Sequence, residues 1–233
     1  MSGWFAEDAG VRYDESTGDE FEPATIEATV DFLEPLARGG ALELAVGTGR
    51  IAVPLATRGI RVAGIDYAPP MIEQLRRKTD AVEAVIGDMT TTQVEGTFSL
   101  VYLVFNSINN VTTQEGQTAV FANAAAHLEP GGCFVVEVGT RPATPLSVFD
   151  LSDTHVGVDE YDALTQRLVS HHFSLRDGVW HRAAGEFRAV SPPELDLMAR
   201  LAGMKLRERW ADWARPPFTA ESRKHVSVWE KTA

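Results

Sequence analysis

The residues Gly47-Thr48-Gly49 form a candidate ligand-binding turn. They follow an apolar run, 41–46, that predicts a buried β-strand, and a helical pattern begins directly after them at 50–58. Glycine lets the backbone come close to a ligand, because a Cβ at either glycine position would block the approach. A strand, a glycine turn and a helix N-terminus in this order are typical of a nucleotide-type binding site.

Two carboxylates help to indicate which nucleotide binds at this turn. The run Gly47–Ala52 matches the G-x-G-x-x-A form of the dinucleotide fingerprint, and Asp66 ends the next strand, where it suits hydrogen bonds from ribose hydroxyls. Glu43 favours another ligand, since a carboxylate beside the turn would repel a pyrophosphate. It would attract the sulfonium and ammonium groups of S-adenosylmethionine. The alternative interpretation is that Glu43 faces solvent or accepts hydrogen bonds from nearby backbone N–H groups.

Leu42–Gly49 resembles the first motif of class I S-adenosylmethionine-dependent methyltransferases, E/D-x-G-x-G-x-G, with Ala45 in place of the first glycine. Other segments resemble the later motifs and follow in the family's order: 64–71, 87–89, 98–102 and 128–135. The resemblance spans roughly residues 25–138. It implies S-adenosyl-L-methionine as the cofactor. The residues that it places at the cofactor are Glu43, Ala45, Gly47, Gly49, Asp66, Tyr67, Met71, Asp88, Met89 and Asn106.

Family roles follow for some of these residues. Asp66 would hold the ribose, Asp88 would contact the adenine amino group, and Met89 would pack on the adenine ring. Asn106 follows the fourth strand, a place that often meets the acceptor in this family. The Asn/Asp-Pro-Pro-Tyr/Phe signature of enzymes that methylate nucleobase or amide nitrogens is absent. We therefore expect methyl transfer by in-line displacement to a nitrogen or oxygen of a small-molecule acceptor.

A hydroxyl or ammonium acceptor needs a base to take its proton. His172 and His155 are the candidate catalytic residues, and His171 and His181 are candidate substrate contacts. His171 and His172 are adjacent on a predicted strand, so only one of them can face a cleft. Tyr13, together with Asn106, is also a candidate substrate contact. The alternatives are histidines that face solvent on a sheet and a tyrosine that only anchors the N-terminal segment.

Composition excludes several classes of partner. The net charge of −12 argues against a nucleic acid or an anionic membrane surface as partner, and the apolar runs are too short to span a bilayer. The only cysteine, Cys133, falls in a predicted buried strand, so an intramolecular disulfide is excluded and a cytoplasmic location fits. No spacing of His, Asp or Glu suggests a metal site. We expect a monomer or a homodimer.

The elements that position these residues predict an α/β fold. Strands alternate with helices, and the strands are nearly continuously apolar, which indicates a Rossmann-like, mostly parallel seven-stranded sheet with helices on both faces. Ligands in such sheets bind beyond the carboxyl ends of the strands, where Glu43, Asp66, Asp88 and Asn106 all fall. Two capping boxes are expected to open helices, one at Thr112–Glu115 and one at Ser191–Glu194.

The chain, 1–233, is expected to form one methyltransferase domain. Its parts are a mobile N-terminal arm (1–22), a cofactor-binding core (23–138), an inserted substrate or lid region (139–190), and a closing helix with strands (191–233). Within the insertion, 139–147 reads as an irregular connection, and Asp177-Gly178 predicts an antiparallel hairpin. The alternative is that this hairpin serves dimerisation or extends the sheet.

Two other functions compete with methyl transfer. The fingerprint at Gly47–Ala52 also fits an NAD-dependent oxidoreductase, although the chain lacks a Tyr-x-x-x-Lys signature. Ala45 and the lack of an obvious base also fit a non-catalytic protein that binds the cofactor without turnover.

Overall fold

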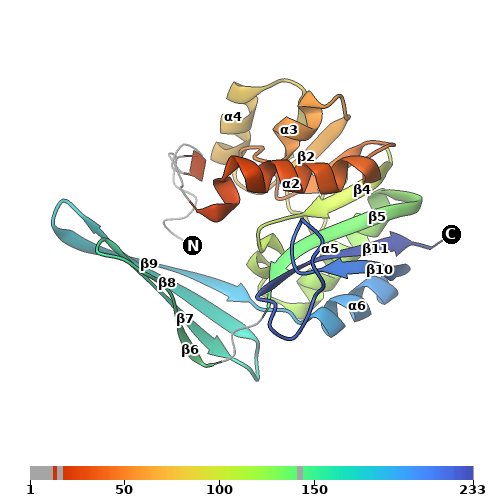
Figure 1. The fold of residues 1–233 in the computed structure, drawn as a ribbon. Coiled ribbons are helices and arrows are strands. Elements are labelled where there is room, and N and C mark those ends of the chain that lie inside the picture. Colours follow the sequence, from red (N-terminus) through yellow and green to blue (C-terminus); the bar gives the residue numbers. More distant parts are fainter. Residues whose placement is uncertain (1–12, 15–17, 141–143, 233) are drawn as a thin grey trace.

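The computed structural model describes residues 13–14, 18–140 and 144–232 (Figure 1). Most of the predicted arm, 1–22, therefore lies outside the described residues. The described part forms two sheets, a seven-stranded one in the core and a four-stranded one that projects from it (Figure 1).

The seven-stranded sheet has the strand order β10-β11-β5-β4-β1-β2-β3. Its strands are β1 (Ala41–Leu44), β2 (Val62–Asp66), β3 (Val82–Ile86), β4 (Phe98–Leu103), β5 (Leu128–Gly139), β10 (Met204–Trp210) and β11 (Lys224–Lys231). β3, β2, β1, β4 and β5 are parallel, and β11 and β10 add antiparallel pairs at one edge. The predicted fold class is confirmed.

Helices cover both faces of this sheet. They are α2 (Pro23–Leu33), α3 (Ala52–Thr57), α4 (Pro69–Lys78), α5 (Gln114–His127) and α6 (Pro192–Leu201), with short 3-10 turns η1 (Asp19–Phe21), η2 (Glu34–Leu36) and η3 (Ser107–Asn110). On one face, Val120 and Phe121 of α5 and Leu195 of α6 pack on the strands. On the other face, Val30 of α2 and Leu55 of α3 do so. The chain thus buries apolar side chains in two layers around one sheet.

Both capping boxes differ from the prediction. The N-cap of α5 is Thr113 rather than Thr112, and its hydroxyl accepts a hydrogen bond from Gly116 N at 3.1 Å. Ser191 is the N-cap of α6, but its side chain makes no capping hydrogen bond. Proline at the first helical position already removes one unsatisfied N–H there, which lessens the need for a cap.

The insertion is a four-stranded antiparallel sheet in the order β6-β7-β8-β9. Its strands are β6 (Leu146–Leu151), β7 (His155–Asp162), β8 (Arg167–Arg176) and β9 (Val179–Arg188). The predicted Asp177-Gly178 turn joins β8 to β9, and both turn residues have positive φ, 51° and 75°. The irregular connection predicted to reach residue 147 is wrong at its end, because β6 begins at Leu146.

The projecting sheet is fastened to the core at Arg188, the last residue of β9. Arg188 is buried and pairs with Glu194 of α6 at 2.6 Å. It also donates to the side-chain oxygens of Gln117 and Gln166, while its own carbonyl accepts from Gln117 at 3.0 Å. A buried arginine needs such a set of acceptors to offset the loss of its hydration.

Candidate cofactor and acceptor site

The backbone that follows β1 and forms the glycine turn has several residues in the left-handed conformation. Ala45, Gly47 and Gly49 have φ values of 55°, 56° and 82°. A Cβ at Gly47 would meet no atom within 4 Å, whereas a Cβ at Gly49 would lie 2.4 Å from Leu75 Cδ1. The two glycines therefore serve different purposes. Gly49 lets α4 pack against the turn, and Gly47 leaves open space where a ligand can approach the backbone.

Asp66, the last residue of β2, holds the turn in place. Its carboxylate accepts hydrogen bonds from Gly47 N at 2.7 Å and from Ala68 N at 2.8 Å. Burial raises the pKa of the Asp66 carboxyl, and these two bonds oppose the rise. A carboxylate offers about four lone-pair sites, so two accepted bonds leave capacity for hydroxyl donors of a ligand.

Glu43 is buried rather than placed at the mouth of the turn. Its side chain is 2% exposed and accepts a hydrogen bond from Tyr102 Oη at 2.9 Å. Burial raises the pKa of Glu43 to about 8, while Tyr102, Arg50 and the backbone N–H of Ala52 act in the opposite direction. The bond from Ala52 matches the alternative interpretation that Glu43 accepts from nearby backbone.

The other predicted cofactor residues lie around the ends of the next strands. Tyr67 is exposed and Met71 half-buried, at the start of α4. After β3, Asp88 is exposed, and its Oδ1 accepts from the Thr90 N–H and hydroxyl, each at 2.7 Å. Met89 is half-buried, and its carbonyl accepts from Asn123 Nδ2 at 2.9 Å.

The loop after β4 is bent sharply. Phe105 and Asn106 have φ values of 54° and 59°, a region that side-chain-bearing residues rarely adopt. Asn106 Oδ1 accepts from Gly139 N at 2.6 Å, which ties this loop to the end of β5. Asn106 is exposed at the carboxyl edge of the sheet, as the sequence predicts for it.

In the N-terminal segment, Asp14 contacts the glycine turn and Tyr13 contacts Arg50, the residue after it. Asp14 accepts from Thr48 Oγ1 at 2.5 Å, Lys78 Nζ at 2.7 Å and Gln74 Nε2 at 3.0 Å. Tyr13 bonds to Arg50, and burial raises the pKa of its hydroxyl while Arg50 opposes this. These contacts bring Tyr13 and Asp14 to the site.

Arg50 connects this segment to the loop after β4. Its guanidinium lies 5.4 Å from the ring centroids of both Phe21 and Phe105. It also donates to the Glu20 carbonyl at 2.5 Å. Together with Asp14, Ile26 and Lys78, Phe21 and Arg50 line a cavity of about 420 Å³. This cavity borders the residue that follows the glycine turn.

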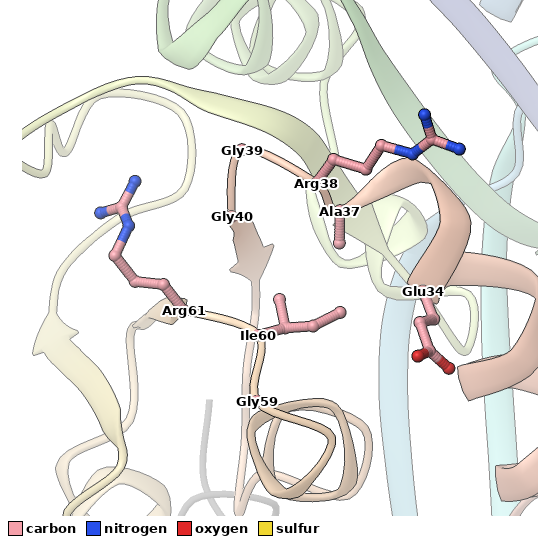
Figure 2. A pocket seen from close by; sticks show the side chains of 8 residues that line it. All are labelled: Glu34, Ala37, Arg38, Gly39, Gly40, Gly59, Ile60 and Arg61. Atoms are coloured by element: carbon pink, nitrogen blue, oxygen red, sulfur yellow. The ribbon is translucent and has the colours of Figure 1, made fainter.

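A larger cavity of about 550 Å³ lies elsewhere (Figure 2). Gly39 and Gly40 on one side precede β1, and Gly59, Ile60 and Arg61 on the other precede β2. It is therefore at the amino ends of the parallel strands, away from the glycine turn. Parallel sheets bind their ligands at the carboxyl ends, so size alone does not identify the site.

The structure does not bring the four candidate histidines to the strand ends. All lie on the projecting sheet, where His155 Nε2 and His172 Nδ1 are 3.1 Å apart. His172 is five residues along β8 from Arg167, which pairs with Arg188 where the sheet joins the core. At about 3.3 Å per residue, this places it roughly 17 Å along the sheet. His171 is also on β8, and His181 is on β9, the edge strand of this sheet.

Burial lowers the pKa of His172, and the neighbouring His155 lowers it further. Both effects favour the neutral form of the His172 imidazole. His155, which contacts His172, also contacts the Asp150 carboxylate through its Nδ1. Among the described residues, no group of three or more His, Cys, Asp or Glu side chains is arranged to hold a metal ion.

Glu137 on β5 is a site residue that the sequence interpretation missed. The residue is 8% exposed, and its carboxylate accepts three hydrogen bonds at the carboxyl edge of the sheet. Within Cys133–Gly139 it is the one acidic residue in an apolar strand. That contrast is the signal that could have indicated it.

Comparisons with known proteins bear on this arrangement. Residues 41–132 match a family described as methyltransferase domain. The chain is 30% identical over 226 residues to the cypemycin N-terminal methyltransferase of a Streptomyces species, covering 89% of each chain. The chain belongs to the class I S-adenosylmethionine-dependent methyltransferases.

Solved methyltransferase structures are similar over nearly the whole chain. The CcbJ methyltransferase from Streptomyces caelestis is 36% identical, with a TM-score of 0.88 and 98% of both chains covered. S-adenosylmethionine-bound CalS10, an amino pentose methyltransferase from Micromonospora echinaspora, is 19% identical, with a TM-score of 0.73 and coverage of 100% of this chain and 99% of that one. The part of this methyltransferase that aligns with these structures therefore includes the insertion as well as the core. No helix in the described ranges combines the length and apolar character needed to cross a membrane.

Proposed function

We propose that this methyltransferase transfers a methyl group from S-adenosylmethionine to an amine nitrogen of a small molecule or peptide. The observation that carries the cofactor assignment is the open space at Gly47, with the Asp66 carboxylate directly beside it. The family membership favours S-adenosylmethionine over NAD, the rival ligand. Two similar proteins, the cypemycin N-terminal methyltransferase and the amino pentose methyltransferase CalS10, support an amine acceptor.

The residues at the carboxyl ends of β1 and β2 fit the cofactor. When bound, S-adenosylmethionine supplies an activated methyl group on a positively charged sulfur. Gly47 offers open backbone, and Asp66 keeps lone pairs for the ribose hydroxyls after accepting two backbone bonds. Asp88 and Met89, after β3, are the proposed adenine contacts, together with Tyr67, which follows β2, and Met71 in the first turn of α4.

In this proposal, Glu43 favours the cationic cofactor from a buried position. It is buried beside Arg50 and Tyr102, so it acts on the turn through the protein rather than through open solvent. A cation bound at the turn would favour its ionised form and lower its pKa. In this proposal, Glu43 becomes a full negative charge when the cationic cofactor is present.

On the acceptor side, Asn106 and Tyr13 are the proposed contacts, with His171 and His181 on the projecting sheet. His172 is the proposed base, with His155 beside it, because its lowered pKa favours the neutral imidazole, the form that takes up a proton. Their position on the projecting sheet requires that an acceptor reach from the strand ends to that sheet. His172→Asn is then expected to lower kcat by about 10²- to 10⁴-fold. His181→Asn, near the outer end of the same sheet, is the companion variant, and its effect should fall on KM.

Calorimetry and turnover test the proposal in sequence. S-adenosylhomocysteine should bind and NAD should not; binding of NAD alone would reject the cofactor assignment. Methyl transfer is then measured with an amino pentose and with a peptide that has a free N-terminus. The matching hydroxy pentose and the N-acetylated peptide serve as controls. Turnover of the amines alone supports the proposal, and turnover of the hydroxy sugar alone refutes the choice of nitrogen. Cofactor binding with no turnover would favour the non-catalytic alternative.

A further inference from the structure

Glu137 lies two residues before the end of β5 and is held by three donors. Its Oε2 accepts from Phe105 N at 3.1 Å. Its Oε1 accepts from Trp213 Nε1 at 3.1 Å and from Lys224 Nζ at 3.1 Å. A buried carboxylate is costly unless a positive charge and hydrogen bonds compensate it, and Glu137 has both.

The three donors differ in how firmly they are fixed. Phe105 N belongs to the backbone of the bent loop after β4, and Trp213 is buried with its ring edge-on to Phe32 at 5.3 Å. Lys224 stands at the first position of β11, and its side chain is 46% exposed. The neutral donors are therefore built into the fold, while the ammonium sits at the end of a flexible chain that solvent can reach.

Glu137 is joined to both residues of the loop where the acceptor is proposed to bind. Its carboxylate holds Phe105, and its carbonyl accepts from Asn106 N at 3.2 Å. Phe105 in turn packs on Arg50, the residue next to the glycine turn. The carboxylate thus lies on the same edge of the sheet as the cofactor residues, displaced toward β5 and β11.

We propose that Glu137 anchors the ammonium group of the acceptor and that Lys224 occupies this place until the acceptor binds. The inference rests on the proposed function, because it needs an amine acceptor. An incoming ammonium can replace the lysine charge for charge, while Phe105 N and Trp213 Nε1 keep the carboxylate in position. An alcohol brings no charge to replace the lysine, so this exchange selects amines over hydroxyl acceptors.

Two variants with opposite expected effects test the exchange. In Glu137→Gln the anchor loses its charge, so KM for the amino pentose or the free peptide rises about tenfold or more, while KM for S-adenosylmethionine stays within about twofold. In Lys224→Met the competing ammonium is gone, so KM for the amine falls roughly two- to fivefold, as expected for loss of a half-exposed ion pair. Lys205→Met is the matched control, because Lys205 forms an exposed pair with Glu230 at 3.5 Å on β10 and β11. It should leave both KM values unchanged.

The same comparison is made without turnover by titrating each amine into protein saturated with S-adenosylhomocysteine. Failure of turnover in the wild type therefore bears on the proposed function, and the calorimetric amine affinities still decide the inference. A purely structural Glu137–Lys224 pair predicts that both variants weaken amine binding alike, and that result would overturn the inference. An unchanged amine affinity in Glu137→Gln would overturn it as well. If Glu137→Gln fails to bind S-adenosylhomocysteine, the Lys224→Met variant decides alone. An increase in its amine affinity supports the inference, and a decrease overturns it.

Discussion

The Asp66 carboxylate accepts a hydrogen bond from the Gly47 N–H at 2.7 Å, which joins the end of β2 to the glycine turn that leaves β1. The acid proposed to hold the ribose therefore also shapes the backbone that the cofactor approaches. A second bond, from Ala68 N, fixes the carboxylate from the side of α4. Loss of this one side chain would disturb two parts of the cofactor site at once.

Asp66→Ala is expected to weaken S-adenosylhomocysteine binding by about 2–4 kcal/mol, or roughly 30- to 1000-fold in Kd. The loss combines the hydrogen bonds to the ligand with those that order Gly47. Calorimetric titration of wild type and variant gives the ratio directly. Asp177→Ala, at the tip of the β8–β9 hairpin, is the control and should bind like wild type. An unchanged Kd in Asp66→Ala would refute the assigned role.

Glu43 predicts a pH dependence of stability with a definite sign. Its folded-state pKa of about 8 lies above its ordinary value of 4.5, so the folded state holds a proton that the unfolded state releases between these values. Its contribution to the free energy of unfolding is therefore lost as pH rises through that window. Glu43→Gln keeps an oxygen acceptor for Tyr102 but cannot ionise. The variant should match wild type near pH 5 and become more stable than it by up to a few kcal/mol near pH 8. Urea unfolding at both pH values measures this, and a constant difference would contradict it.

Asp14 should show the opposite dependence. Hydrogen bonds from Lys78 and Thr48 lower the pKa of the Asp14 carboxyl, although its partial burial acts the other way. Its stabilising contribution is therefore present above pH 3.8, its ordinary value, and is lost as pH falls through the folded-state pKa. Asp14→Asn should lower the free energy of unfolding by roughly 0.5–1 kcal/mol at pH 7, since the pair is partly exposed. The difference from wild type should shrink in acid; a difference that grows there would be inconsistent with the contacts to Thr48 and Lys78.

Arg188→Met should be strongly destabilising because it leaves Glu194 with an uncompensated, mostly buried charge. The expected loss is about 3–5 kcal/mol in the free energy of unfolding. Arg167→Met removes an arginine–glutamate pair with Glu186 whose side chains are 51% and 55% exposed, and it should cost far less, because solvent screens such a pair. Adding Glu194→Gln to Arg188→Met should recover part of the loss. Equal effects of the two arginine variants would show that Arg188 does not fasten the projecting sheet.

The core of the fold could be predicted because its sequence patterns are local. Apolar strands followed by helical periodicity fixed the positions of β1 to β5, and Asp66 and Asn106 could be assigned to strand ends by counting along those strands. β6 and β7 were not predicted, because a register shift between Val148 and Asp150 interrupts the alternation of side chains in β6. β6 is almost entirely exposed and β7 mostly half-exposed, so neither strand has one continuous buried apolar face.

The environment of the site residues depended on contacts between distant segments. The burial of Glu43 is set by Tyr102, which lies 59 residues further along the chain. The surroundings of Glu137 come from Phe105, Trp213 and Lys224, which belong to three separate segments. No local pattern encodes such partners, so the sequence could name a carboxylate near a strand end but not its state of ionisation.

The projecting sheet leaves the core after β5 and returns to it at α6, and η3 contacts both β5 and β9 where this happens. Residues 144–188 therefore form a cassette inserted at a single junction, while the segments that shape the glycine turn all precede it. If the projecting sheet contacts the acceptor, as proposed, exchange of this cassette between related enzymes would alter that contact without rebuilding the nucleoside pocket. The part of acceptor recognition that lies on the projecting sheet can in this way diverge independently of donor use within one chain.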